Sequence, residues 1–281
     1  MSRTFHAQGI DVPAFLYGTA WKEGATERLV SEALDAGFRG IDTANQRKHY
    51  FEEGAGAALR NALESNLSRD QLFIQTKFTH PSGQDHRLPY DPSANARTQV
   101  RQSLMSSLEH LGLERIDSYL IHGPDSRHGL GDYDRAVWGA MEELKQEGLI
   151  ELIGISNVTA EQVETLCDMA EVPPAFVQNR CYAQMGWDFD VRRVCRDHGI
   201  VYQGFSLLTA NIRQIQSDQV VEIARRLGKT IPQIIFRFAN QMGMISLTGT
   251  TDRAHMNEDL DIFDFDLSED ELRQIERIGV R

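Results

Sequence analysis

Three ionisable residues, Asp42, Lys77 and His122, each close a short apolar run of the sequence. A carboxylate beside a buried ammonium keeps that ammonium charged, and the ammonium in turn brings the pKa of a neighbouring proton-transfer group toward neutrality. The proton donor that such a set needs is Tyr50, eight residues beyond Asp42. A phenol has an ordinary pKa of about 10 and needs a nearby cation to release its proton. These residue types therefore predict acid–base chemistry.

Taken one at a time, the same residues also fit structural roles. Asp42 is placed to cap the turn that follows it, Lys77 to extend its ammonium to the surface, and His122 to be a hydrogen-bonded core histidine. All three have the same position relative to their apolar runs, which favours the chemical interpretation over the structural one.

Two other chemistries use the same residue types. Histidines at positions 49, 80, 86 and 122 would suit a metal hydrolase, but no strand carries an H-x-H pattern, so we expect no metal. A lysine at a strand end would also suit a Schiff-base aldolase. Its predicted partner Asp42 argues against that role, because an ion-paired lysine stays protonated and is a poor nucleophile.

The elements that must position these residues alternate along the whole chain. Short apolar runs predict eight strands, at 14–18, 38–42, 72–77, 116–122, 149–155, 176–179, 200–205 and 244–248. Helical periodicity predicts helices at 26–36, 94–111, 133–147, 160–169, 189–197, 218–227 and 269–278. This alternation, without a flexible linker, predicts an α/β fold: one (β/α)8 TIM barrel domain over residues 1–281.

A short hairpin at 5–12, with its turn at 8–9, is expected to cover the bottom of the barrel. The rival fold, a doubly wound sheet, requires a glycine-rich phosphate turn directly after an early strand. The motif GAG at 54–56 is the nearest match, but it follows a polar segment and lacks the third glycine. In a barrel, chemistry collects at the carboxyl ends of the strands, where the three ionisable residues lie.

Composition restricts the partners. The chain has 29 Lys and Arg against 41 Asp and Glu, a net charge of −12, so its mean field repels nucleic acids and anionic membranes. No apolar run is long enough to span a membrane, and the N-terminus lacks the apolar core of a signal peptide. Three cysteines without C-x-x-C spacing fit reduced thiols. We expect a cytoplasmic protein without nucleic-acid or membrane partners.

Several segments together resemble the signature segments of the aldo-keto reductase superfamily. They are GTAW at 18–21, GFRGIDTA at 37–44, TK at 76–77, SL at 107–108, DSYLIHGP at 117–124, GISN at 154–157 and FDFDLS at 263–268. They stand in the family's order and extend over nearly the whole chain. The resemblance implies a (β/α)8 barrel, frequently a monomer, that reduces a small aldehyde or ketone with a nicotinamide cofactor.

Carried over residue by residue, the resemblance assigns roles at the reacting centre. Tyr50 would be the general acid that protonates the carbonyl oxygen, and Lys77 would lower its pKa. Asp42 would pair with Lys77, and His122 would orient the carbonyl. The substrate would lie against Trp21 and His122 while hydride comes from the bound cofactor.

The resemblance also implies a set of cofactor-binding residues: Gly18, Thr19, Ser156, Asn157, Gln178, Phe205, Ser206, Leu208, Thr248, Gly249, Thr250, His255, Glu258 and Asp259. Ser156, Asn157 and Gln178 would hydrogen-bond the nicotinamide carboxamide. Phe205 stands where the family usually has a stacking tyrosine, and phenylalanine offers the same aromatic face.

One departure from the family pattern concerns the proton donor. The family's tyrosine usually follows the aspartate by five residues, where this chain has Arg47, and counting back from Gly56 places His49 in the tyrosine position. We choose Tyr50, because its phenol suits the acid step and the loop at 45–49 can bulge around the extra residues. His49 is the rival donor, with an ordinary pKa nearer neutrality.

A second departure concerns the adenosine end. The segment TGT at 248–250 and His255 replace the Pro-Lys-Ser and arginine with which many members hold the 2′-phosphate. Thr250 and the helix start near Asp252 still offer a phosphate site, whereas Asp259 adds negative charge. The cofactor usual in the family is NADP(H), which we favour, and the missing cations leave the use of NAD(H) open. The alternative function is a nicotinamide-nucleotide-binding sensor or regulatory barrel with weak or no turnover.

Overall fold

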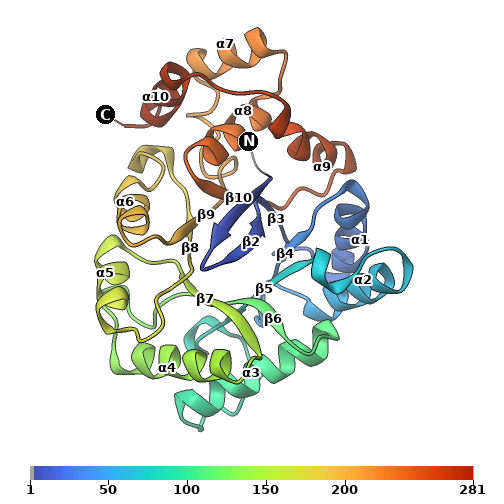
Figure 1. The fold of residues 1–281 in the computed structure, drawn as a ribbon, viewed down its shortest axis with the longest axis vertical. Helices are drawn as coiled ribbons and strands as arrows, with labels where there is room; N and C mark the ends of the chain where they lie inside the picture. Colours follow the sequence, from blue (N-terminus) through green and yellow to red (C-terminus); the bar gives the residue numbers. More distant parts are fainter. Residues whose placement is uncertain (1–2, 281) are drawn as a thin grey trace.

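A computed structural model describes residues 3–280, which form a closed barrel of eight parallel strands (Figure 1). The strand order around the barrel is β10-β3-β4-β5-β6-β7-β8-β9. The (β/α)8 barrel predicted from the sequence is therefore confirmed. The barrel strands are β3 (Phe15–Gly18), β4 (Gly40–Asp42), β5 (Phe73–Phe78), β6 (Ile116–Ile121), β7 (Ile150–Ser156), β8 (Phe176–Arg180), β9 (Val201–Phe205) and β10 (Met244–Thr248).

Helices surround the barrel and connect its strands (Figure 1). The predicted helices are present, with ends within two residues of the predicted ones. The helices are α1 (Thr26–Ala36), α2 (Glu52–Ser65), α3 (Ala96–Leu111), α4 (Asp132–Gln146), α5 (Ala160–Met169), α6 (Phe189–Asp197), α7 (Asp218–Leu227), α8 (Ile231–Gln241), α9 (Arg253–Leu260) and α10 (Glu269–Arg277).

Helices α2 and α8 have no counterpart among the predicted elements, and of α9 only the start near Asp252 was expected. Helix α2 carries Gly54 and Gly56, which lower helix propensity. A Cβ on Gly56 would lie 2.0 Å from the backbone oxygen of His110, so glycine at this position allows α2 to pack closely on α3. Helix α9 is short and weakly amphipathic. Packing therefore outweighs local propensity in α2 and α9. Helix α8 differs, because its capping box and first-turn proline are both typical of a helix start.

The predicted hairpin is present as β1 (Thr4–Ala7) and β2 (Ile10–Pro13), paired antiparallel. Ala7 and Val12 are buried in one apolar cluster with Phe73 and Phe176, the first residues of β5 and β8. The hairpin therefore closes the amino-terminal end of the barrel, and Figure 1 shows it in front of the strands. The opposite end carries the candidate site.

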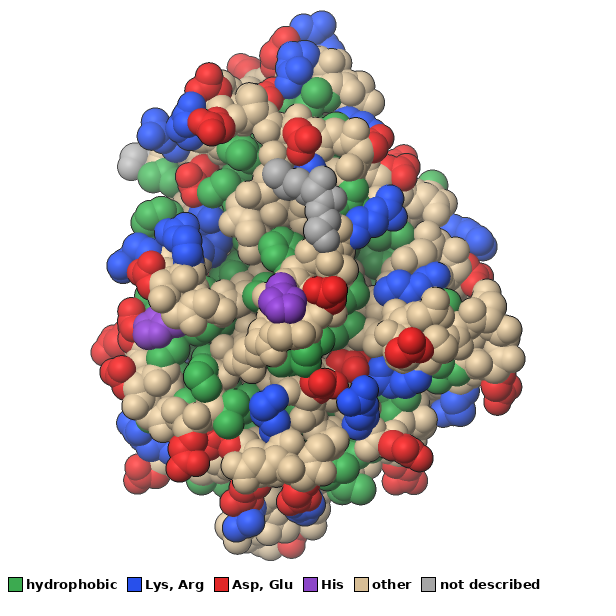
Figure 2. All heavy atoms as spheres, viewed as in Figure 1, with side chains coloured by type: hydrophobic (Ala, Val, Ile, Leu, Met, Phe, Trp, Pro, Cys, Tyr) green, Lys and Arg blue, Asp and Glu red, His purple; other side chains and the backbone are tan. Residues whose placement is uncertain are grey.

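Figure 2 shows the hairpin face of the molecule, where acidic and basic side chains are interspersed. Within residues 3–280, no helix combines the length and the apolar character needed to cross a membrane. Cys167, Cys181 and Cys195 form no disulfide with one another.

Candidate active site

The ends of three neighbouring strands carry the predicted ionisable residues. Asp42 is the last residue of β4, Lys77 is the last but one of β5, and His122 directly follows β6. These strands are parallel and adjacent, so their carboxyl ends meet at one mouth of the barrel. The structure therefore brings together side chains that are 80 positions apart between Asp42 and His122.

Asp42 and Lys77 form a buried ion pair. Lys77 Nζ lies 2.7 Å from both carboxylate oxygens of Asp42 and donates a third hydrogen bond, 2.8 Å, to the backbone oxygen of Thr43. The two residues are only 3% and 1% exposed, respectively. Burial lowers the pKa of Lys77, and the charge and hydrogen bonds of Asp42 oppose that shift. Asp42 thus stabilises an ammonium in a site that disfavours charge.

Tyr50 lies between this ion pair and His122. Its ring centroid is 5.6 Å from Lys77 Nζ and 5.7 Å from the His122 ring centroid, with the two rings edge to face. No residue in the range 3–280 hydrogen-bonds its hydroxyl, which is not among the fully buried polar atoms, so the hydroxyl keeps some exposed surface. Burial, and then the charge of Asp42, raise the pKa of Tyr50 above its ordinary range. The phenol is therefore protonated at neutral pH.

His122 is held as a neutral imidazole. Its Nδ1 lies 2.7 Å from the hydroxyl of Thr79. Burial, followed by the charge of Lys77, lowers the pKa of His122 to about 3. The Thr79 hydroxyl can both donate and accept, so this contact is compatible with the tautomer that carries its proton on Nε2. His122 is then a hydrogen-bond donor without a charge.

The rival donor His49 faces a different neighbour. Its ring stacks on Trp21 with centroids 3.7 Å apart, and its backbone oxygen accepts from the Trp21 N–H at 2.7 Å. Trp21 has a left-handed backbone, φ +62°, and is 70% exposed. His49 and Trp21 therefore form an aromatic rim at the mouth, while Tyr50 contacts the ammonium. This arrangement supports Tyr50 as the donor.

The chain before Tyr50 forms a tight turn that absorbs the additional residues of this loop. The N–H groups of His49 and Tyr50 both donate to the backbone oxygen of Gln46, at 3.1 and 3.0 Å. The side chain of Asn45 donates to a backbone oxygen of α3, and that of Gln46 donates to Gly83. The loop is therefore anchored to α3 and to the loop after β5, which fixes the direction of Tyr50.

The residues predicted to meet the nicotinamide lie at the ends of β7, β8 and β9. Ser156 Oγ donates to the backbone oxygen of Gln178 at 2.6 Å, and Asn157 Nδ2 donates to that of His122 at 2.7 Å. Gln178 Nε2 donates to Asp42 at 3.1 Å. Phe205 ends β9, half-buried, and is followed by Ser206 and the partly buried Leu208. The structure therefore joins this group directly to the ionisable residues.

Several residues that the sequence analysis did not select also lie at the mouth. The guanidinium carbon of Arg180 lies 5.6 Å above the Phe205 ring, and Lys22 Nζ donates to the backbone oxygen of Gly249. Gln75 and Gln203 extend a hydrogen-bond network around Asp42. Gln75 and Gln203 interrupt predicted apolar strands, which was the signal available in the sequence.

The residues predicted for the adenosine end gather around β3, β10 and α9. A Cβ on Gly18 would lie 3.3 Å from the backbone oxygen of Thr248, so these two strands approach closely there. Thr19 is fully buried, and its hydroxyl donates to the backbone of Asp42 at 3.1 Å. The backbone oxygen of Thr250 accepts from the Tyr17 hydroxyl at 2.8 Å. This group thus continues the mouth beyond the strand ends.

The start of α9 is already capped within the chain. Asp252 accepts from the N–H of Ala254 at 2.7 Å and from that of His255 at 3.4 Å. On the same short helix, Glu258 is partly exposed and Asp259 is buried. Burial raises the pKa of Asp259 to about 7, against a hydrogen bond from Thr248 and the charge of His255. The Asp252 carboxylate already occupies the start of α9, which makes it less favourable for a phosphate than we expected from the sequence.

The histidines considered for a metal site do not assemble into one. His80 lies 3.2 Å from Asp134, away from the contacts made by His49 and His122. Within residues 3–280, no group of three or more His, Cys, Asp or Glu side chains is arranged to hold a metal ion.

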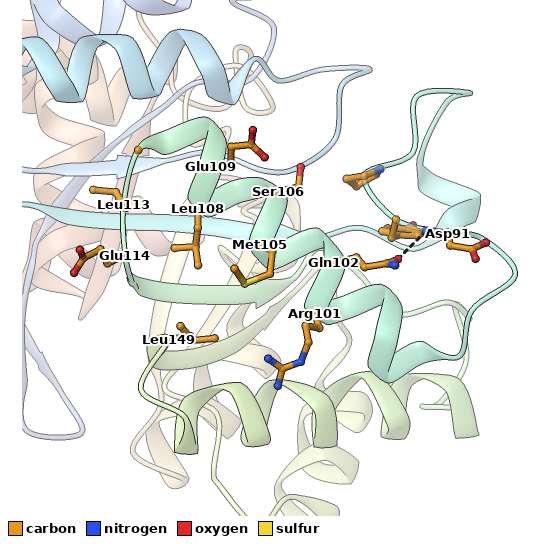
Figure 3. Close-up of a pocket in the computed structure, with 13 residues that line it drawn as sticks. Asp91, Arg101, Gln102, Met105, Ser106, Leu108, Glu109, Leu113, Glu114 and Leu149 are labelled. Carbon is orange, nitrogen blue, oxygen red and sulfur yellow. Dashed lines mark hydrogen bonds between the residues drawn. The ribbon is translucent and has the colours of Figure 1, made fainter.

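A groove of about 1030 Å³ lies outside the barrel, along α3 (Figure 3). Gln102, Met105 and Leu108 project from α3 into it, and Leu113 and Leu149 line it further. None of the residues predicted for the reaction or the cofactor lines this groove. It is therefore separate from the site at the barrel mouth.

Comparison with known proteins agrees with this geometry. The family model described as the aldo/keto reductase family matches residues 17–280. The chain is 34% identical to D-galacturonate reductase of Fragaria ananassa, over 90% of this chain and 81% of the relative. A solved aldo/keto reductase of Brucella melitensis superimposes with a TM-score of 0.84 at 29% identity, covering 98% of each chain.

A Bombyx mori aldo-keto reductase, solved in complex with NADP, superimposes with a TM-score of 0.84 at 25% identity, over 98% of this chain and 92% of that one. The sequence match and the structural matches cover nearly the whole barrel. The chain belongs to the aldo/keto reductase family.

Proposed function

We propose that this chain is an NAD(P)H-dependent oxidoreductase that reduces an aldehyde or ketone to an alcohol. The observation that carries the proposal is the position of Tyr50. Its ring stands beside the Lys77 ammonium and the neutral His122 ring, and its protonated hydroxyl has no hydrogen-bond partner among residues 3–280. Membership of a family of reductases supports the same class of reaction.

The residues at the mouth suit a nicotinamide cofactor. Gln178 keeps a side-chain oxygen without a partner among residues 3–280, and the half-buried Phe205 ring lies at the end of the next strand. An amide acceptor beside an aromatic face matches the carboxamide and ring of a nicotinamide. When bound, the reduced cofactor supplies the hydride that the carbonyl carbon receives. Ser156 and Asn157 complete the proposed carboxamide site.

We favour NADP(H) as the cofactor and leave NAD(H) open. Lys22 brings a cation to the loop that carries Gly249, where positive charge favours phosphate. The acidic Asp252 and Asp259 act against an additional phosphate on the same side. One structural neighbour, from Bombyx mori, was solved with NADP.

The proposed proton transfer uses Tyr50, Lys77 and Asp42. The Tyr50 O–H donates its proton to the carbonyl oxygen as the carbonyl carbon becomes bonded to hydrogen, which gives the alcohol and a phenolate. The Lys77 ammonium stabilises that phenolate, and Asp42 keeps Lys77 charged despite its burial. Solvent then reprotonates Tyr50, whose hydroxyl is open to the mouth.

Substrate binding uses the remaining two residues of the proposed set. A neutral His122 with its proton on Nε2 donates a hydrogen bond to the carbonyl oxygen and thereby orients it. Trp21 offers an exposed apolar face at the rim. We therefore propose a small-molecule carbonyl as the substrate. We also propose that the enzyme is cytoplasmic and monomeric.

The experiment mixes the purified protein with NADPH, then with NADH, and with a panel of aldehydes and ketones, including uronates and dicarbonyls. Loss of reduced-nicotinamide absorbance measures turnover. We expect turnover with at least one cofactor, and the ratio of kcat/KM values gives the preference. Tight binding of both cofactors without turnover on any carbonyl would contradict the proposal and favour a nucleotide-binding sensor.

A further inference from the structure

Three glutamines and a serine lie together in the interior of the barrel next to Asp42. They are Gln75 on β5, Ser118 on β6, Gln178 on β8 and Gln203 on β9. Gln178 is 3% exposed and the other three are fully buried. A buried amide is costly unless its polar atoms find partners, so such a cluster requires a consistent set of hydrogen bonds.

The cluster forms one connected network that ends on the carboxylate. Gln75 Nε2 and Gln178 Nε2 donate to Asp42 Oδ1 at 2.7 and 3.1 Å. Both also donate to Gln203 Oε1, each at 2.8 Å. Gln203 Nε2 donates back to Gln75 Oε1 at 3.0 Å, and Ser118 Oγ donates to that same oxygen at 2.8 Å.

This network has one self-consistent direction. A carboxylate only accepts, so Gln75 and Gln178 must both turn their NH2 groups toward Asp42. Gln203 must then present its oxygen between those two NH2 groups, because the opposite orientation would set three donors against one another. The charge of Asp42 thereby determines the orientation of all three amides.

The direction of the network decides what Gln178 offers to the mouth. Both hydrogens of its Nε2 are engaged, one by Asp42 and one by Gln203. Its Oε1 has no partner among residues 3–280 and is absent from the fully buried polar atoms without one, so it is open to solvent. Gln178 therefore presents an acceptor, and no donor, at the place proposed for the nicotinamide carboxamide.

We propose that Gln203 is a positioning residue that acts through Gln178. By accepting one hydrogen of the Gln178 amide, it holds Gln178 Oε1 toward the mouth, where that oxygen accepts a hydrogen bond from the carboxamide NH2. This inference rests on the proposed cofactor site. Without the Gln203 acceptor, Asp42 still attracts the Gln178 NH2, but this single, longer contact restrains the amide less than the two contacts together.

The test compares two ligands that differ in the NH2 group alone. NADP⁺ carries a carboxamide, whereas its 3-acetylpyridine analogue carries an acetyl group that has the oxygen but no donor. We expect the native chain to bind NADP⁺ about fivefold more tightly than the analogue, the factor expected for one neutral hydrogen bond. Gln203→Leu and Gln203→Met should bind the two ligands equally, with NADP⁺ weakened to the level of the analogue.

Two further variants separate positioning from a general loss of structure. Gln203→Glu keeps an oxygen that accepts from Gln178, so it should keep the fivefold preference even where its added charge lowers turnover. Gln99→Met removes another buried glutamine, on α3, whose side chain donates to backbone oxygens outside the site. It should bind both ligands as the native chain does. Dissociation constants come from isothermal titration calorimetry.

The outcomes distinguish this inference from the proposed function. A native chain that reduces carbonyls but binds both ligands equally would overturn the positioning role and leave the reductase intact. Retention of the preference in a folded Gln203→Met or Gln203→Leu chain, or its loss in Gln203→Glu, would also overturn it. A native chain that binds neither these two ligands nor NAD⁺ and its 3-acetylpyridine analogue would overturn both proposals.

Discussion

The two sides of the barrel mouth each bury an aspartate, and the two aspartates have different partners. On the β4–β6 side, Asp42 accepts from Lys77 and from two glutamine amides. On the β10–α9 side, Asp259 is equally buried, but within residues 3–280 no Lys, Arg or His nitrogen lies within 4.0 Å of its carboxylate. The first side holds a buried ion pair, and the second side carries a carboxyl that resists ionisation.

The largest effect is expected from breaking the charge pair. Lys77→Met removes the cation that we propose stabilises the Tyr50 phenolate, so kcat should fall by about a thousandfold, within the usual contribution of acid–base catalysis. Because Asp42 would keep its two amide donors, we expect the chain to fold with lower stability and to bind cofactor nearly normally. Steady-state kinetics, cofactor titration and circular dichroism measure these properties. A folded Lys77→Met chain with native kcat would remove Lys77 from the mechanism.

A smaller effect is expected where the aspartate has no basic partner. Burial raises the pKa of Asp259 to about 7, so the folded state binds this proton more tightly than the unfolded state, whose aspartate has a pKa of about 3.9. The resulting stability is complete below about pH 4 and is lost as the pH rises through 7. Asp259→Asn cannot ionise, so its free energy of unfolding relative to the native chain should rise by roughly 2 kcal/mol from about pH 5 to pH 8.

Urea unfolding at both pH values measures this difference. The control is Asp261→Asn, an exposed aspartate directly after α9, which should stay within about 0.5 kcal/mol of the native chain at both pH values. An Asp259→Asn chain whose relative stability is the same at the two pH values would mean that Asp259 is ionised throughout.

The smallest effect is expected from a lysine on the cofactor side. Lys22 is partly exposed and donates to the backbone oxygen of Gly249, whereas Lys77 is buried. Lys22→Met should weaken cofactor binding by about fivefold, the scale of an exposed charged hydrogen bond, and leave kcat within about twofold. Steady-state kinetics with varied cofactor test this, because KM for the cofactor should rise while kcat stays nearly unchanged. Equal losses in Lys22→Met and Lys77→Met would erase the distinction between the two sides.

Sequence patterns were sufficient for the barrel and for the ionisable residues at its strand ends. The apolar runs placed Asp42, Lys77 and His122 at one mouth because parallel strands align their carboxyl ends. The different surroundings of His49 and Tyr50 are visible only in the structure. Both lie in one loop, and only the turn at Gln46 shows that one faces Trp21 and the other faces the ammonium.

The missed residues share a physical cause. Gln75 and Gln203 are polar residues inside strands, and their partners lie on strands far apart in the sequence, so no local pattern reveals the network. Lys22 follows the predicted Trp21, but its contact with Gly249 joins two ends of the chain. Helix α2 was missed because its glycines lower helix propensity, whereas close packing on α3 favours it. Helix α8 was missed although its capping box and first-turn proline are signals of a helix start.

The central claim is that Tyr50, and not His49, donates the proton. Single-turnover reduction of an aldehyde that the native chain accepts, with saturating cofactor, compares Tyr50→Phe with His49→Phe. We expect Tyr50→Phe to lose at least about a hundredfold in rate with unchanged cofactor affinity. His49→Phe keeps an aromatic ring against Trp21 and should lose less than about fivefold. A near-native rate in Tyr50→Phe, or a greater loss in His49→Phe, would contradict this claim.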